Sequence, residues 1–252
     1  MPDGIININK PEGMTSHDVV NAIRRTIKGT KVGHTGTLDP MATGVLPVCL
    51  GQATRITEYM LSDDKKYRCE MTLGIESDTQ DIWGTIIDTR PVNVEKEAIL
   101  EALNSFQGTI IQTPPIYSAL KVNGKKLYEY ARKGQTVDIK PRQVEIYDIS
   151  VLNIEKGKVL FDVSCSKGTY IRTLCHDIGG ILGCGAVMSK LMRTKSGRFT
   201  IEDAINFEDL DKLDISQYIF PMDYPLQHMG SAKIHDEEGY RKVINGCLLT
   251  ED

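Results

Sequence analysis

Several common sequence features are missing from this chain of 252 residues. No apolar run approaches the roughly 20 residues that a membrane-spanning helix needs. The N-terminus has no basic segment followed by a long apolar one, which argues against a secretory signal. Six scattered cysteines form no Cys-x-x-Cys pair, so free buried thiols are favoured over a zinc site or a disulfide framework. We therefore expect a cytoplasmic globular protein with no membrane contact.

Motifs that bind cofactors, metals or phosphates are also missing. The chain has no Gly-x-x-x-x-Gly-Lys-Ser/Thr loop, no His-Glu-x-x-His pair and no Gly-x-Ser-x-Gly elbow. Its glycine-rich run at 179–185 lacks dinucleotide-binding spacing and ends a helical pattern, where a dinucleotide site would begin one. We expect chemistry that needs neither a cofactor nor a metal ion.

The net charge of −4 hides an uneven distribution of charge. Residues 200–252 hold 12 acidic and 4 basic side chains, which leaves 22 acidic and 26 basic side chains in residues 1–199. The bias is strongest between Tyr117 and Arg142, where seven basic residues face two acidic ones. A concentrated basic surface attracts phosphates even on an acidic chain, although such a run can also be only a solvated face.

The periodicity of apolar residues predicts both strands and helices. A capping box at Thr15 and Asp18 predicts a helix start, and Gly183 predicts a helix end. Because strands and helices do not alternate regularly, we predict an α+β fold with a mixed, largely antiparallel sheet and flanking helices. The expected strands are 5–8, 45–50, 67–73, 85–87, 144–154 and 158–164, and the expected helices are 15–27, 53–61, 94–106 and 171–182.

One irregular segment, residues 29–44, lies between confidently predicted elements. It holds four glycines and Asp39-Pro40, and a long loop inside a compact domain is usually functional or disordered. Its low charge and small residues argue against simple disorder. Asp39 is therefore a candidate catalytic carboxylate, with a structural turn as the alternative.

Two further residues suggest a site. Arg172 is expected in the first turn of its helix, where a cation opposes the helix dipole, so pairing with a buried carboxylate would explain it. Tyr67 follows two lysines at the start of a strand, a pattern that suits stacking on RNA bases. An exposed helix arginine and a core tyrosine are the alternatives.

Together these residues resemble the bacterial tRNA pseudouridine-55 synthases, the TruB family. The resemblance covers about residues 4–225. It is carried by Lys10-Pro11, the 33–47 loop and strand, Lys66-Tyr67, and the segments 114–121, 124–132 and 166–172.

The resemblance implies an isomerase with a pseudouridine-synthase fold that converts uridine 55 in the T arm of tRNA, without a cofactor or an obligate protein partner. It implies that Asp39 is catalytic, that Arg172 is its partner and that Tyr67 is the active-site tyrosine. Tyr67, His34, Tyr170 and Leu191 match positions that contact the target nucleotide or its surroundings. The RNA-binding candidates are Lys10, Lys121, Lys125, Lys126 and Arg132.

The C-terminus departs from the family pattern, which commonly ends in a small RNA-binding PUA domain. A composition break near Pro221–Pro225 leads us to predict a catalytic domain at 1–225 and a reduced or truncated PUA-like segment at 226–252. Three alternatives stay open: a non-catalytic tRNA-binding module, a metal-free glycosidase, and a guide-RNA-dependent member of the same superfamily.

Overall fold

The computed structural model describes residues 3–61, 64–230 and 233–247. Its strands, in chain order, are β1 (Gly4–Lys10), β2 (Val32–His34), β3 (Thr43–Leu50), β4 (Lys65–Leu73), β5 (Ile75–Ser77), β6 (Ile86–Thr89), β7 (Gly108–Gln112), β8 (Lys121–Val122), β9 (Lys125–Lys126), β10 (Arg142–Glu155), β11 (Lys158–Cys165), β12 (Ala186–Ser196), β13 (Phe199–Thr200), β14 (Ile205–Asn206) and β15 (Ile219–Phe220). The α-helices are α1 (Ser16–Thr26), α2 (Thr57–Leu61), α3 (Lys96–Asn104), α4 (Leu127–Ala131), α5 (Ile171–Ile181) and α6 (Glu237–Ile244).

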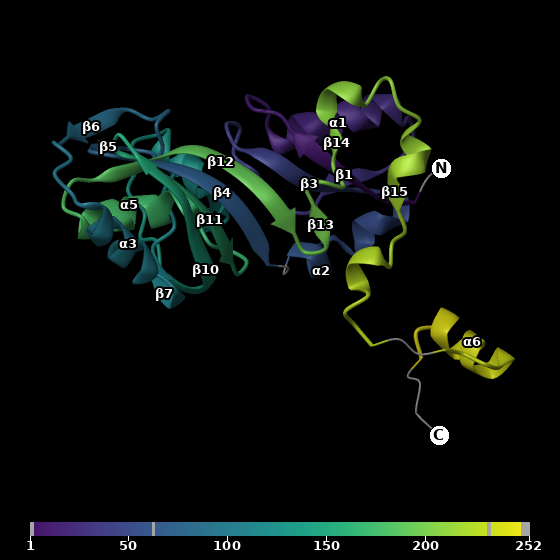
Figure 1. Cartoon of the computed structure of the whole chain (residues 1–252). Coiled ribbons are helices and arrows are strands. Elements are labelled where there is room, and N and C mark those ends of the chain that lie inside the picture. The colour runs from purple at the N-terminus through teal and green to yellow at the C-terminus, as the bar shows by residue number, and fades with distance from the viewer. Residues whose placement is uncertain (1–2, 62–63, 231–232, 248–252) are drawn as a thin grey trace.

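Eleven strands form one sheet with the main order β14-β1-β3-β12-β4-β11-β10-β7 (Figure 1). Only the β1–β14 and β3–β12 pairs are parallel, and the other pairs in this sheet are antiparallel. The predicted α+β class and mixed, largely antiparallel sheet are therefore confirmed. Two small hairpins, β5–β6 and β8–β9, lie outside this sheet.

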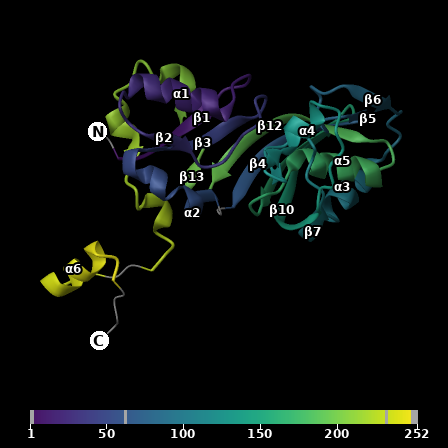
Figure 2. The same ribbon diagram turned by 180° about the vertical axis from the view of Figure 1, so that it is seen from behind.

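Helices cover the sheet at two places, seen from opposite sides in Figures 1 and 2. Near one end, α1 buries Val19, Val20 and Ile23 in a core that it shares with β1 and β3. Near the other end, α3 and α5 pack in a second core with residues of β4, β10, β11 and β12. The strands β4 and β12 lie centrally in the sheet, so residues on them are held from both sides.

The sequence signals for the start of α1 and for the start and end of α5 are confirmed. Thr15 caps α1 through the capping box with Asp18, which satisfies backbone N–H groups that the first turn leaves free. Helix α5 begins at Ile171, so Arg172 does lie in its first turn, and Gly183 follows its end with a φ of +73°.

Some elements differ from the prediction. The central strand β12 was not predicted, although Val187, Met188, Leu191 and Arg193 are all buried in it. Its first four residues are buried on both faces, and further along Arg193 is buried while Met192 is exposed, so the alternation of polar and apolar residues that identifies a strand is weak. The predicted helix 53–61 is a 3-10 turn, Gly51–Arg55, followed by the short α2, and the loop 29–44 includes the strand β2.

The C-terminal helix α6 lies apart from the sheet in both views and contains no buried residue (Figures 1 and 2). The PUA-like resemblance falls partly on residues 231–232 and 248–252, which lie outside the described part of the chain. The domain boundary after residue 225 stays a prediction. Within the described part of the chain, no helix is both long and apolar enough to cross a membrane.

Candidate active site

Asp39 lies in the loop between β2 and β3, and hydrogen bonds from α1 hold this loop in place. The buried Ser16 hydroxyl accepts from the Leu38 N–H at 2.9 Å and donates to the Leu38 carbonyl at 3.2 Å. The Asp39 carbonyl accepts from the Ala42 N–H at 3.0 Å, which closes a turn around Pro40. The loop residue is therefore fixed by its neighbours, as a preorganised site requires.

Gly44 shows why the end of this loop contains glycine. Its φ is +100°, and a Cβ atom added there would lie 2.2 Å from the carbonyl oxygen of Arg193 on β12. Only glycine allows both this backbone conformation and this close approach. The pairing of β3 with β12, which brings the Asp39 loop to the centre of the sheet, depends on it.

Lys10 corrects one RNA-binding assignment. Its side chain is fully buried, and its Nζ donates to the carbonyls of Pro11, Met14 and Pro40 at 2.8, 2.6 and 3.0 Å. Burial lowers the pKa of Lys10 to about 8, so the ammonium keeps its proton at neutral pH. Lys10 pins the Asp39-Pro40 turn and presents no surface to a phosphate in this structure.

Arg172 pairs with Asp39 as the resemblance implied. The Nε of Arg172 lies 3.0 Å from Oδ2 of Asp39, and the arginine side chain is 5% exposed while that of Asp39 is 44% exposed. The remaining donors of Arg172 reach the carbonyls of Thr79 and Tyr117 at 3.0 and 2.8 Å. Nη1 of Arg172 also lies 3.5 Å from Oδ2 of Asp81. The guanidinium thus has a fixed position, with one carboxylate on either side.

A cavity of about 180 Å³ adjoins this ion pair. Among the described residues, Asp39 and Arg172 are the predicted site residues that line it. Tyr67, His34, Tyr170 and Leu191 lie outside its lining. The sequence analysis did not identify the other residues of the lining, which come from four separate segments. They are Pro40, Met41, Ala42, Thr79, Asp81, Trp83, Tyr117 and Met188.

Tyr67 on β4 faces Arg193 on β12, its partner in the strand register. Burial raises the pKa of the Tyr67 phenol, and the hydrogen-bonded guanidinium of Arg193 opposes this effect. Arg193 is itself buried, and it donates to the Val45 and Gly36 carbonyls at 2.7 and 3.3 Å. Arg193 could not be recognised as a partner of Tyr67 from the sequence, because the two residues are 126 positions apart.

The other predicted nucleotide contacts lie on three separate elements. His34 on β2 accepts from the Gly36 N–H at 3.3 Å, and burial together with nearby Arg193 and His17 lowers the pKa of its imidazole. Tyr170 precedes α5, and its ring lies 4.8 Å from the guanidinium of Arg142. Leu191 lies on β12, opposite Cys69 of β4.

The other predicted RNA-binding residues lie on the β8–β9 hairpin and just after α4, which Figure 2 shows near α5. Lys121, Lys125 and Arg132 are exposed, and Lys126 is half-buried. Lys126 and Arg132 lie 5.4 and 5.3 Å from the Tyr128 ring. None of the ion pairs between described residues includes these four cations, so their charges are available to phosphate.

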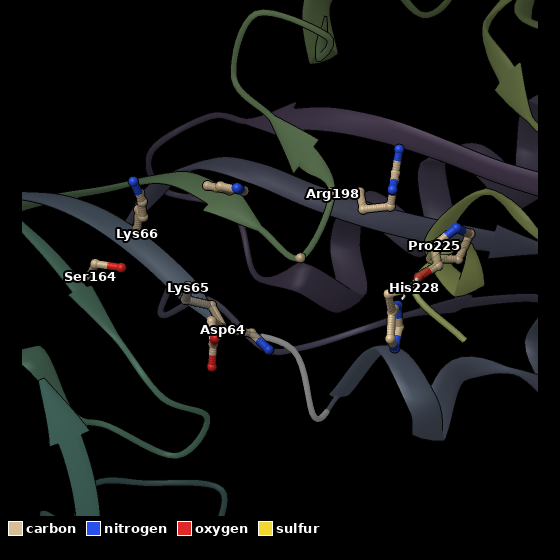
Figure 3. Close-up of a pocket in the computed structure, with 9 residues that line it drawn as sticks. Asp64, Lys65, Lys66, Ser164, Arg198, Pro225 and His228 are labelled. Carbon is tan, nitrogen blue, oxygen red and sulfur yellow. Dashed lines mark hydrogen bonds between the residues drawn. The ribbon is translucent and has the colours of Figure 1, made fainter. Parts of the chain in front are cut away.

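A second hollow, of about 430 Å³, lies at the N-terminal end of β4 (Figure 3). Lys66 and Ser164 lie on one side of it, and Arg198 and His228 lie on the other. Lys195 also lines this hollow and is the register partner of Lys66. Its cations come from distant segments, so no run of basic residues marks it in the sequence. We call Lys66, Lys195 and Arg198 the pocket cations.

No group of three or more His, Cys, Asp and Glu side chains within residues 3–61, 64–230 and 233–247 is arranged to hold a metal ion. The ion pair between Asp39 and Arg172 instead presents a partly exposed carboxylate beside a cavity. Such a carboxylate can attack an electron-poor carbon, stabilise developing positive charge or remove a proton.

Comparison with known proteins identifies the family. Residues 24–171 match the model of the TruB family pseudouridylate synthase N-terminal domain, and residues 172–227 match the tRNA pseudouridylate synthase B C-terminal domain. The tRNA pseudouridine synthase B of Alkaliphilus oremlandii is 54% identical over 97% of this chain and 82% of its own length. That of Clostridium kluyveri is 51% identical over 99% of this chain and 86% of its own length.

Solved structures agree with this assignment. A Cbf5–Nop10–Gar1 complex matches with a TM-score of 0.71 and 36% identity, over 90% of this chain and 62% of that chain. An H/ACA ribonucleoprotein bound to a substrate RNA containing 2′-deoxyuridine matches with a TM-score of 0.68 and 34% identity, over 90% of this chain and 61% of that chain. The chain therefore belongs to the TruB family of pseudouridylate synthases, which are isomerases.

Proposed function

We propose that this protein converts uridine 55 in the T arm of tRNA to pseudouridine, with Asp39 as its catalytic carboxylate. The observation that carries the proposal is the Asp39–Arg172 pair, in which a buried arginine orients a carboxylate that stays accessible from a cavity. The relatives from Alkaliphilus oremlandii and Clostridium kluyveri are named as tRNA pseudouridine synthases, which supports tRNA as the substrate.

The reaction breaks the N1–C1′ glycosidic bond, turns the uracil and joins C5 to C1′. The proton on C5 leaves and N1 ends with a proton, so the reaction is redox-neutral. Direct attack at C1′ and removal of the C2′ proton are alternative first steps, and both require an ionised carboxylate near the sugar. Arg172 pairs with the Asp39 carboxylate and fixes its direction.

Tyr67 is the proposed acceptor of the C5 proton. Burial raises the pKa of its phenol, so the resting phenol must first give up its own proton, which N1 of the detached uracil can accept, and Arg193 beside it would stabilise the resulting phenolate. This phenolate then takes the C5 proton. The target uridine lies in a folded loop, so it must flip out of the stack before it reaches Asp39. We propose that the His34 side chain fills the space that the flipped base leaves. Burial lowers the pKa of its imidazole, so this side chain is uncharged at neutral pH.

Release of tritium from a tRNA transcript labelled at C5 of uridine tests the proposal, because C5 loses its hydrogen when it bonds to C1′. We expect release from a bare transcript, with no guide RNA and no other protein. The same transcript with cytidine at position 55 should release none. No release from the first transcript would favour a guide-dependent enzyme or a non-catalytic binding module.

Release from the cytidine-55 transcript would move the target to another uridine. A glycosidase would yield free uracil and an abasic site, which chromatography of the products would detect. In that case the second catalytic acid of a glycosidase would have to be found, and the sequence offers no clear candidate.

A further inference from the structure

Trp83 is the single tryptophan of the chain, and it lines the cavity that Asp39 and Arg172 share. It is 41% exposed, whereas Arg172 and Met188 in the same lining are buried. The indole is thus at the solvent-facing rim of the cavity.

The ring of Trp83 has no partner within the described structure. None of the aromatic or cation–π contacts found there involves it, and no hydrogen bond there comes from its indole N–H. A large aromatic side chain left partly exposed beside a catalytic ion pair has an open π-face. Such a face suits stacking on a nucleobase.

The backbone that carries Trp83 is held in place by several contacts. Oδ1 of Asp81 accepts from the Trp83 N–H at 3.1 Å and from the Thr79 hydroxyl at 2.7 Å. The next residue, Gly84, has no room for a side chain, because an added Cβ would lie 2.1 Å from Oγ1 of Thr79. Since Asp81 also lies near Arg172, one carboxylate contacts both the guanidinium of Arg172 and the backbone of Trp83.

We propose that the indole of Trp83 stacks on the RNA base next to the target uridine. When the target base leaves the stack, its neighbour loses a stacking face, and the indole at the cavity rim replaces that face. The inference rests on the proposed function, since it takes a flipped uridine at Asp39 as its starting point. Stacking of one base on one aromatic ring is expected to contribute roughly fivefold to 150-fold in affinity.

Intrinsic fluorescence tests the contact directly, because Trp83 is the only tryptophan. The Asp39→Asn variant is titrated with a T-arm hairpin RNA, which prevents turnover during the measurement. We expect saturable quenching with the same Kd as filter binding. A hairpin with abasic sites on both sides of the target uridine should still bind but should quench much less.

Variants give the second test. Trp83→Ala should raise the Kd of the hairpin RNA at least fivefold, and Trp83→Phe should recover most of the affinity. Ile87→Ala, which truncates a 64% exposed residue on neighbouring β6, is the matched control and should bind like wild type.

Two results would overturn the stacking contact: RNA that binds without quenching Trp83, or an unchanged Kd in Trp83→Ala. Neither result touches the proposed function, which wild-type tritium release tests separately. If wild type releases no tritium while quenching occurs, the isomerase proposal fails and the contact survives as an RNA-binding feature.

Discussion

The surroundings of Asp39 and the basic region of the β8–β9 hairpin use charge in opposite ways. Around Asp39, the cations are buried and each is held by several acceptors: Arg172 by two carboxylates and two carbonyls, and Lys10 by three carbonyls. On the β8–β9 hairpin and α4, the cations are exposed or half-buried and form no ion pair with a described residue.

The difference corresponds to two tasks. A reacting carboxylate needs a fixed direction before the substrate arrives, and buried, multiply bonded partners provide it at no cost during the reaction. Phosphate binding needs mobile cations that can follow an RNA backbone and displace its counterions. We therefore expect substitutions in the first region to change the chemical step and substitutions in the second to change affinity and its salt dependence.

The largest effect is expected for Asp39→Asn. The amide keeps the size of the side chain but removes the charge that both candidate mechanisms require, so the single-turnover rate should fall at least about a thousandfold, or about 4 kcal/mol in the barrier. Tritium release measures this loss, and filter binding should show unchanged affinity for tRNA. Asp148→Asn, which removes an exposed carboxylate on β10, is the matched control. A rate within about tenfold of wild type would refute the catalytic assignment.

Tyr67→Phe should give the next largest effect. Removing the hydroxyl removes the proposed proton acceptor and its bond to Arg193, so the chemical step should slow about a hundredfold or more. Single-turnover rates at several salt concentrations would check this, because the slope of log Kd against log salt should stay that of wild type. A slower step that is fully explained by weaker RNA binding would show instead that Tyr67 serves only in binding.

The basic region should behave in the opposite way. Changing Lys125, Lys126 and Arg132 together to alanine should weaken tRNA binding and flatten the salt slope by roughly 0.7 to 0.9 per lost phosphate contact. The single-turnover rate at saturating enzyme should change little.

The pocket cations provide a charge-matched comparison, since changing all three to alanine also removes three positive charges. We expect this second triple variant to change the slope less than the first, because the hairpin lies close to the Asp39 cavity. The Tyr117 carbonyl, just before the hairpin, accepts a hydrogen bond from Arg172. An unchanged slope in the hairpin variant would indicate that RNA binds elsewhere. The alternatives are the pocket cations and the basic residues at and after the end of α1, Arg24, Arg25 and Lys28.

The smallest effect concerns His34 and pH. Because its pKa is lowered below the usual 6.5 in the folded state, the unfolded chain takes up this proton more readily. The stability associated with an uncharged His34 is therefore fully present above pH 6.5 and is lost as the pH falls toward the folded-state pKa. His34→Gln should reduce the drop in Tm between pH 7.5 and 5.5 by about 2 °C. An identical drop in both proteins would show that His34 does not titrate as its surroundings indicate.

Much of the local structure was predictable because its causes are local. The capping box at Thr15, the helix start before Arg172 and the end at Gly183 each depend on residues within a few positions of one another. Arg172 lies in the first turn of α5, where a cation opposes the helix dipole, and this position predicted a carboxylate partner. In the structure this partner is Asp39. The central strand β12 was not predicted because its first four residues are buried on both faces and, further along, Arg193 is buried while Met192 is exposed, which weakens the alternating pattern.

The sequence by itself determined the mixed fold class, the family, and Asp39, Tyr67 and Arg172 as the candidate site residues. Only the tertiary structure decided which other residues join them. Asp81 and Trp83 reach the Asp39 cavity from a turn, Arg193 reaches Tyr67 from the neighbouring strand, and Lys10 turns inward. These contacts join segments 30 to more than 120 residues apart. Sequence periodicity reports only which side of an element is buried, whereas strand pairing and loop packing decide what each buried or rim residue touches.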